Sequence, residues 1–342
     1  MGTLKSRKWM RTIQKTLYYI IPPVILVFIF MKIDIGSFFT TFKNIDLKYY
    51  LMGLAFYPPI IMVGAYRWYY LKRRMINPGI PLSFSMNNYW IGLSVGFLAP
   101  GSIGWDIYRI IAATRKYGSL VKNAFVAVTE KLSGLTVCSL IIIVAFPFLD
   151  VSSNDVINRI SLFAYIIFFG LVVFVAISGL FSRRFEFLSR IAFRVQKSLM
   201  DRLKNTRFKF SEYLKKETGE NQEMKYNFRK IIPGIPVLLV LTIIIQLISS
   251  FSYYLIIKSV NYDLPFYVPL FISPVMTFIF LLPISFGSIG IREGSYIFFY
   301  GIFGMDREAA LLLSFLTLSG AFLNVLIGAI VMQVSSVRRI ME

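Results

Sequence analysis

The chain has 342 residues, of which 56% are hydrophobic and only 16% are charged, and its mean hydropathy is +0.66. A soluble domain of this composition could not cover its own surface with polar groups, so we expect a polytopic membrane protein. The excess of 37 Lys and Arg over 17 Asp and Glu is typical of loops facing anionic lipid headgroups, and it makes a nucleic-acid partner a weak hypothesis. The chain has no His and one Cys, Cys138, which excludes or nearly excludes disulfides, His-based acid–base chemistry and Cys/His metal sites. We therefore expect no metal and no other cofactor.

Six apolar runs predict transmembrane helices, judged against the roughly 20 residues needed to cross a bilayer. They cover residues 17–31, 49–71, 124–149, 160–181, 231–257 and 309–334. The first run follows five basic residues but leads into no small-residue cleavage site. We expect it to be a retained helix and not a signal peptide.

Two further apolar stretches predict broken helices. Residues 82–99 end at a Pro-Gly turn, residues 264–282 end at Pro283, and each stretch is followed by a Gly-rich turn and a shorter apolar piece. Proline and glycine interrupt the backbone hydrogen bonds, and the groups they release are tolerated at membrane depth only inside protein or beside a water-filled cavity. The pairs at 82–114 and 264–303 are therefore predicted to be re-entrant.

The distribution of Lys and Arg predicts the orientation. With a cytoplasmic N-terminus and with each broken pair returning to its side of entry, the inner segments carry 27 basic residues and the outer segments carry six. If only one member of the first pair crossed, the strongly basic segment 182–230 would lie outside, against the positive-inside tendency. We expect a multi-pass protein of the cell (plasma) membrane with both termini in the cytoplasm.

An internal repeat accompanies the broken pairs. A shift of 186 residues superimposes Gly101 and Gly104 on Gly287 and Gly290, and ten of 40 positions match where roughly three are expected by chance. The predicted orientation makes the two units inverted with respect to each other, which is typical of transporters with a site near the midplane. The sequence thus predicts an all-α polytopic membrane protein with six transmembrane helices and two re-entrant helix pairs in an inverted repeat.

The chain is expected to contain three parts. Residues 1–181 form the first membrane half and residues 231–342 form the second. Residues 182–230, between them, have the spacing of a basic amphipathic helix on the inner membrane surface. A solvated linker with no lipid role is the alternative, and binding to lipid or to a partner stays open.

Charged residues within membrane segments are costly and are therefore candidates for function. They are Arg67, Asp106, Arg109, Glu130, Lys131, Arg292 and Glu293. Asp106 and Arg109 lie three residues apart, so they share one helix face and can pair. Structural ion pairs are the simpler interpretation. Two helix starts after Gly turns, each bearing an Arg, offer amides and guanidinium groups that suit a phosphate.

Three segments together resemble the transmembrane region of lysylphosphatidylglycerol synthases, the flippase-like family. They are FLAPGSIGWDIYR at 97–109, TEKLSG at 129–134 and PISFGSIGIREG at 283–294. By resemblance, the family's functional positions fall on Pro100, Gly101, Asp106, Arg109, Glu130, Lys131, Pro283, Ser285, Arg292 and Glu293. Lys131 stands where Arg is more usual in the family. A Lys ammonium can neutralise a phosphate, but it cannot form the bidentate pair of hydrogen bonds that an Arg guanidinium forms.

The resemblance implies a translocase that moves an anionic or phosphate-bearing lipid between leaflets. Aminoacyl-phospholipids, polyprenyl-phosphate-linked lipids and ordinary anionic phospholipids are all candidate substrates. We expect no enzyme, because the chain offers no His and no Asp-x-Asp motif, although an integral-membrane enzyme or scaffold for lipid-phosphate or glycolipid synthesis is the alternative. Membrane lipids are the expected partners, with a homo-oligomer or a lipid-modifying enzyme as further candidates.

Overall fold

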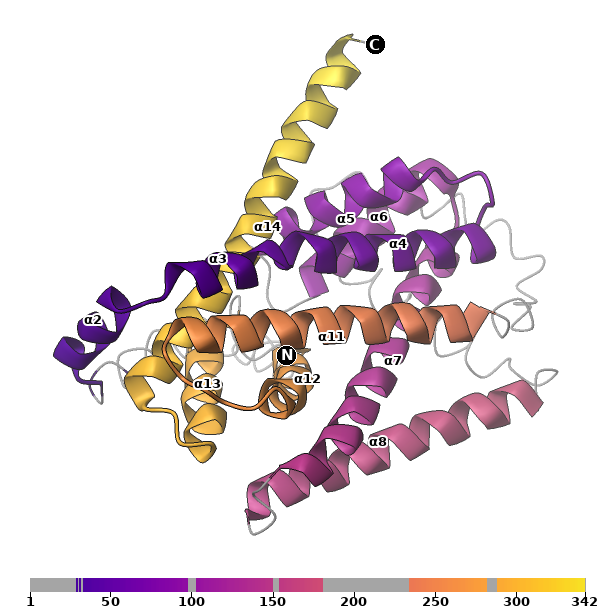
Figure 1. Ribbon diagram of the computed structural model, residues 1–342. Helices are drawn as coiled ribbons and strands as arrows, with labels where there is room; N and C mark the ends of the chain where they lie inside the picture. Colours follow the sequence, from indigo (N-terminus) through magenta and orange to yellow (C-terminus); the bar gives the residue numbers. More distant parts are fainter. Residues whose placement is uncertain are drawn as a thin grey trace, which may run out of the picture.

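The computed structural model describes residues 33–97, 103–149, 154–180, 234–281 and 288–341, together with Ile29 and Met31. Every regular element in these ranges is helical (Figure 1). In chain order they are α2 (Ile35–Lys43), α3 (Leu47–Ala55), α4 (Tyr57–Met75), α5 (Leu82–Phe97), α6 (Ile103–Tyr117), α7 (Leu120–Ala145), η1 (Phe146–Phe148), α8 (Asp155–Leu180), α11 (Ile235–Ser259), α12 (Tyr267–Leu281), α13 (Ile291–Ile302) and α14 (Arg307–Met341).

Five helices among the described residues are long and apolar enough to cross a membrane. They are Leu47–Met75, Lys122–Phe148, Asp155–Val173, Ile235–Ser259 and Arg307–Ser335. These confirm five of the six predicted spans, with shifted ends. The remaining predicted span, 17–31, lies almost entirely outside the described residues, as do the basic segment 182–230 and the turns containing Gly101, Ser285 and Gly287.

The distribution of polar and apolar side chains supports the membrane assignment. On α8, Leu162 and Ile166 are 60% and 63% exposed, although they are purely apolar. In contrast, Glu130, Arg109 and Ser250 are almost completely buried between helices. Apolar side chains outside and polar side chains inside are what a bilayer requires of a helical bundle.

Helix starts follow local sequence signals. The side chain of Asp46 accepts hydrogen bonds from Lys48 N and Tyr49 N at the start of α3, and Asn154 does the same for Val156 N and Ile157 N before α8. The span Leu47–Met75 is interrupted at Phe56, just before Pro58 and Pro59. Neither proline can donate to the preceding turn, so α3 ends there and α4 begins.

Helix α11 packs antiparallel to α3 and α4. Asp46 N donates to Ser259 O (2.8 Å), and Ser252 Oγ donates to Gly53 O (2.8 Å). Further along, Arg67 Nη1 donates to Thr242 Oγ1 (2.9 Å), so residue numbers rise on one side as they fall on the other. Figure 1 shows the same opposed courses of α4 and α11.

Glycines bring α5 and α6 together. A Cβ on Gly96 would lie 2.5 Å from Trp105 N, and one on Gly92 would lie 2.9 Å from the Trp105 ring. Since Gly92 and Gly96 are one turn apart, they form a smooth face against which α6 lies. This close approach carries Asp106 and Arg109 into the bundle interior.

Candidate functional site

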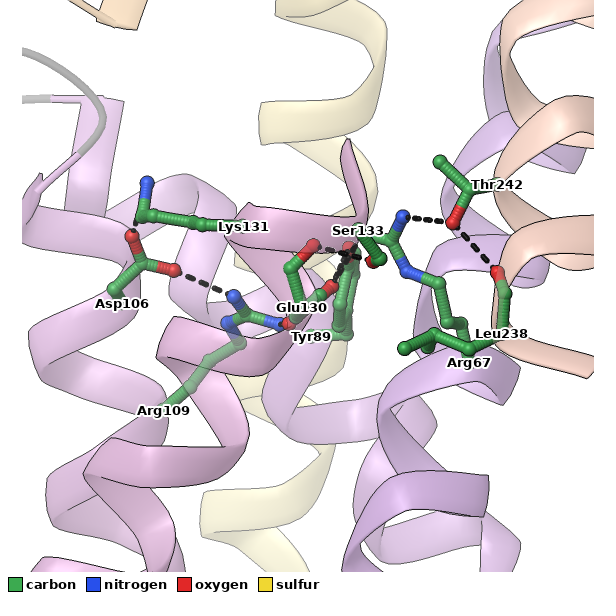
Figure 2. Close-up of polar contacts among 9 residues, drawn as sticks. All are labelled: Arg67, Tyr89, Asp106, Arg109, Glu130, Lys131, Ser133, Leu238 and Thr242. Atoms are coloured by element: carbon green, nitrogen blue, oxygen red, sulfur yellow. Dashed lines mark hydrogen bonds and ion pairs between the residues drawn. The ribbon is translucent and has the colours of Figure 1, made fainter. Parts of the chain in front are cut away.

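Glu130 on α7 is the centre of a buried charge cluster (Figure 2). Its Oε1 accepts from Arg67 Nη2 (2.8 Å) and from Tyr89 Oη (3.1 Å), and its Oε2 accepts from Arg109 Nη1 (3.0 Å). The residue is 3% exposed. Two guanidinium groups thus share one carboxylate in a region from which water is largely excluded, where charge-assisted hydrogen bonds are strong.

Arg109 is fixed in place from several sides. Its second terminal nitrogen, Nη2, donates to Asp106 Oδ1 (2.6 Å), which confirms the predicted pairing of these two residues. The guanidinium also lies against three aromatic rings, Trp68, Tyr89 and Trp105, at 4.5 to 5.2 Å from their centroids. Because Arg109 is 3% exposed and already paired twice, it positions the cluster and is poorly placed to meet a ligand directly.

Lys131 lies at the accessible end of the cluster. Its Nζ pairs with Asp106 Oδ2 (2.8 Å), and its side chain is 38% exposed, against 3–11% for the other charged members. Three cations, Arg67, Arg109 and Lys131, face two carboxylates. Among the residues that the structure describes, the cluster therefore holds one more cation than carboxylate, and its most exposed charged member, Lys131, is a cation.

The cluster also joins the two halves of the chain. Arg67 on α4 contacts Glu130 through one terminal nitrogen and Thr242 on α11 through the other. Thr242 Oγ1 in turn donates to Leu238 O (2.7 Å) within its own helix. In the sequence Arg67 is only one of the charged residues within membrane segments, whereas the structure places it inside the cluster.

Two other residues were not predicted, Tyr89 within the cluster and Lys72 beside it. Tyr89 appears in the sequence as one aromatic residue among many, although its hydroxyl contacts Glu130. Lys72 is 0% exposed, and its Nζ lies 3.5 Å from the centroid of Trp68, the ring that Arg109 also faces. The sequence conceals the burial of Lys72, because it stands beside Arg73 and Arg74, which are exposed.

The charged residues of the second half occupy separate places. Glu293 is 1% exposed and caps its own helix, with Gly290 N donating to Oε2 (2.6 Å) and Ser314 Oγ approaching Oε1 (3.5 Å). Arg292 lies 5.3 Å from the Phe280 ring and forms no ion pair with any residue that the structure describes. Neither residue contacts the Glu130 cluster, so the structure does not bring all the candidate residues together.

The glycine turns are described only in part. Gly104 lies in the first turn of α6, and Gly290 precedes α13 with a φ of 82°, in the left-handed region that favours glycine. The other three candidates from these turns, Gly101, Ser285 and Gly287, lie outside the described residues. Within the described ranges, no three Cys, Asp or Glu side chains are grouped as metal ligands.

Comparison with known proteins gives one match. A family model for the lysylphosphatidylglycerol synthase TM region matches residues 18–328, which is most of the chain. No curated protein and no solved structure matches. The matched range includes all the charged residues described above, and the chain belongs to the lysylphosphatidylglycerol synthase TM region family.

Proposed function

We propose that this protein is a flippase-like lipid translocase that moves a lipid with a phosphate-bearing headgroup between leaflets. The observation that carries the proposal is the charge cluster around Glu130, with its surplus positive charge and its one half-exposed member, Lys131. A phosphodiester carries one negative charge and would neutralise that surplus. An aminoacyl-phospholipid and a polyprenyl-phosphate-linked lipid both carry such a phosphate, although the amine of the former adds positive charge.

Translocation further needs a site that can be reached from each face in turn. We infer two re-entrant pairs, α5–α6 and α12–α13, in inverted repeats, with both termini cytoplasmic. Two observations support this inference: helices α5 to α7 recur as α12 to α14 at about the 186-residue spacing, and α11 runs antiparallel to α4. The paired glycines Gly118 and Gly304, 186 residues apart, also share positive φ values of 72° and 82°.

The test uses vesicles reconstituted with the purified protein and phosphatidylglycerol labelled on its headgroup. An impermeant quencher added outside then reports how fast the inner-leaflet lipid becomes accessible. We expect Lys131→Ala to slow this rate about tenfold or more, because a hydrogen bond to a charged group is lost from the ligand. Lys131→Arg should retain most of the rate, because the positive charge is kept.

Lys258→Ala is the matched control. Lys258 also belongs to a membrane helix and pairs with an Asp, Asp263, but it lies at the far end of α11, away from the cluster. Its loss should leave the rate unchanged. A wild-type rate equal to that of protein-free vesicles would contradict the proposal and favour an enzyme or a scaffold.

A further inference from the structure

Lys72, beside the charge cluster, is a buried cation without a counter-ion. It lies in the last turn of α4 and is 0% exposed, and its Nζ has no hydrogen-bond partner. Aromatic rings lie against it instead: Nζ is 3.5 Å from the centroid of the Trp68 ring and 4.3 Å from that of the Phe84 ring. These rings attract the positive charge, but they leave the three N–H donors of the ammonium group without an oxygen acceptor.

A second ammonium group shares these rings. Lys116, in the last turn of α6, places its Nζ 5.2 Å from the Phe84 centroid and 5.8 Å from the Tyr117 centroid. Lys72 Nζ lies 6.0 Å from the Tyr117 centroid, and the two rings are in edge-to-face contact, with their centroids 4.9 Å apart. Phe84 and Tyr117 thus bring together two cations from different helices, one of them buried and the other exposed.

No carboxylate balances these two lysines. Neither forms an ion pair with any residue that the structure describes. Between residues 47 and 129, a range that includes α4, α5 and α6, the sequence contains one acidic residue, Asp106. Its two oxygens are already paired with Arg109 and Lys131. Buried charges in proteins are normally paired, and like charges repel, so the arrangement of the two ammonium groups matches an anionic ligand.

We propose that Lys72 and Lys116 form a binding site for the phosphate of an anionic lipid headgroup. Lys72 lies three residues before the end of the candidate span Leu47–Met75, a depth at which lipid phosphates are found. An ammonium group binds phosphate oxygens as a point charge, and the half-buried rings of Phe84 and Tyr117 offer an apolar surface beside it. The ligand would enter on the side of the exposed Lys116.

The charge of the site predicts its preference among lipids. Two cations without a carboxylate should favour phosphatidylglycerol over phosphatidylcholine, whose choline group would meet the same positive charges. The first cluster differs, because its carboxylates can stand beside a headgroup amine. The site is also separate from the proposed transport, since binding there does not require the lipid to cross the membrane.

The experiment measures lipid binding to the purified protein in detergent by native mass spectrometry. Phosphatidylglycerol and phosphatidylcholine with the same acyl chains are added separately. Each variant is made in a Lys131→Ala background, which removes the lipid contact proposed for the first cluster. We expect Lys72→Met and Lys116→Met each to bind phosphatidylglycerol about tenfold more weakly than this background, because each loses a hydrogen bond between charged groups. Equal binding of the two lipids by the background protein would overturn the site.

Arg73→Met is the matched control. It removes the same charge one residue further along α4, but the Arg73 guanidinium is bonded to Tyr69 Oη (2.6 Å) and forms no contact with the two shared rings. Its loss should leave phosphatidylglycerol binding unchanged. An equal loss in Arg73→Met would show only a general attraction between a basic helix end and anionic lipid, and a loss in fewer than both lysine variants would overturn the paired site.

Thermal unfolding without added lipid separates this site from a purely structural role of Lys72. Methionine lacks the buried charge and its desolvation cost, so Lys72→Met should melt at the temperature of the background protein or above it. Weaker binding with unchanged or higher melting would support the site, whereas lower melting with unchanged binding would show that Lys72 only holds the helices together. Lys116 is exposed, so Lys116→Met still decides the matter if Lys72→Met does not fold.

Inorganic phosphate distinguishes a lipid phosphate from a free one. Added at the concentration of phosphatidylglycerol, it should not displace the lipid, and displacement would overturn the lipid assignment. The proposed function can fail separately. If vesicles show no transport but phosphatidylglycerol binding still depends on Lys72 and Lys116, the site stands as a lipid site. If transport depends on Lys131 while binding is unchanged in both lysine variants, only this site is wrong.

Discussion

Glu130 and Asp106 are both paired carboxylates, but the cations that they pair with differ in how deeply they are buried. Glu130 pairs with two buried guanidinium groups, whereas Asp106 pairs with Arg109 and with the half-exposed Lys131. If Asp106 is replaced, Arg109 still pairs with Glu130, and water can solvate the ammonium group of the half-exposed Lys131. If Glu130 is lost, Arg67 and Arg109 both lose a buried counter-ion.

We therefore expect Glu130→Gln to lower the free energy of unfolding by about 3 to 5 kcal/mol, and Asp106→Asn by clearly less. Thermal unfolding in detergent checks the order. The double variant Arg67→Met/Glu130→Gln should lose less than the sum of its single changes, because the two groups are in contact. Equal losses for Glu130→Gln and the exposed control Asp263→Asn would show that the cluster contributes nothing.

The site was predictable only where partners are close in sequence. The three-residue spacing of Asp106 and Arg109 is enough to predict their pairing on one helix face. Arg67 is separated from Glu130 by 63 residues and from Thr242 by 175, and no local pattern links them.

At the scale of helices, contact between α5 and α6 depends on the absence of side chains at Gly92 and Gly96. A Cβ on Gly96 meets the Trp105 backbone nitrogen, which cannot rotate away. A Cβ on Gly134 of α7, in contrast, has no atom within 4 Å.

Gly96→Ala is therefore expected to destabilise the protein by about 1 to 3 kcal/mol through overpacking, and to reduce transport by displacing Asp106 and Arg109. Gly134→Ala should be neutral or slightly stabilising, because alanine favours the helix. Thermal unfolding and the vesicle assay measure both effects. Wild-type behaviour of Gly96→Ala would mean that α6 does not depend on this contact.

Helix positions were largely predictable, and helix contacts were not. Five apolar runs correspond to five candidate spans, because the length of an apolar stretch is a strong signal in a membrane protein. The interruption at Phe56 was missed, although Pro58 and Pro59 were visible within an apparently continuous run. The role of Gly92 and Gly96 depends on which helix lies opposite, and that is a property of the fold.

For the molecule as a whole, the inferred inverted arrangement predicts which loops face each side of the membrane. In a Cys138→Ala background, a single Cys at the exposed Arg115 should react with an impermeant thiol reagent only after the inner face is opened. A single Cys at Asp263, whose side chain is 90% exposed, should react in intact cells. The buried Cys138 is replaced so that only the introduced thiol is read.

Labelling of both positions from one side would contradict the inverted arrangement. A site between inverted units needs one gate on each face, so alternating access would also be excluded. The protein would then have a binding site open to a single side.

The position of Arg67 between Glu130 and Thr242 also affects how the chain is made. Synthesis proceeds at roughly 5 to 20 residues per second, so the 63 residues between Arg67 and Glu130 take about 3 to 13 s. During that interval the Arg67 guanidinium cannot pair with Glu130, and an unpaired cation within a membrane segment is costly. The Arg67–Glu130 pair can therefore form only after α7 has been made, so the order of synthesis determines when the charge cluster of the first half can be completed.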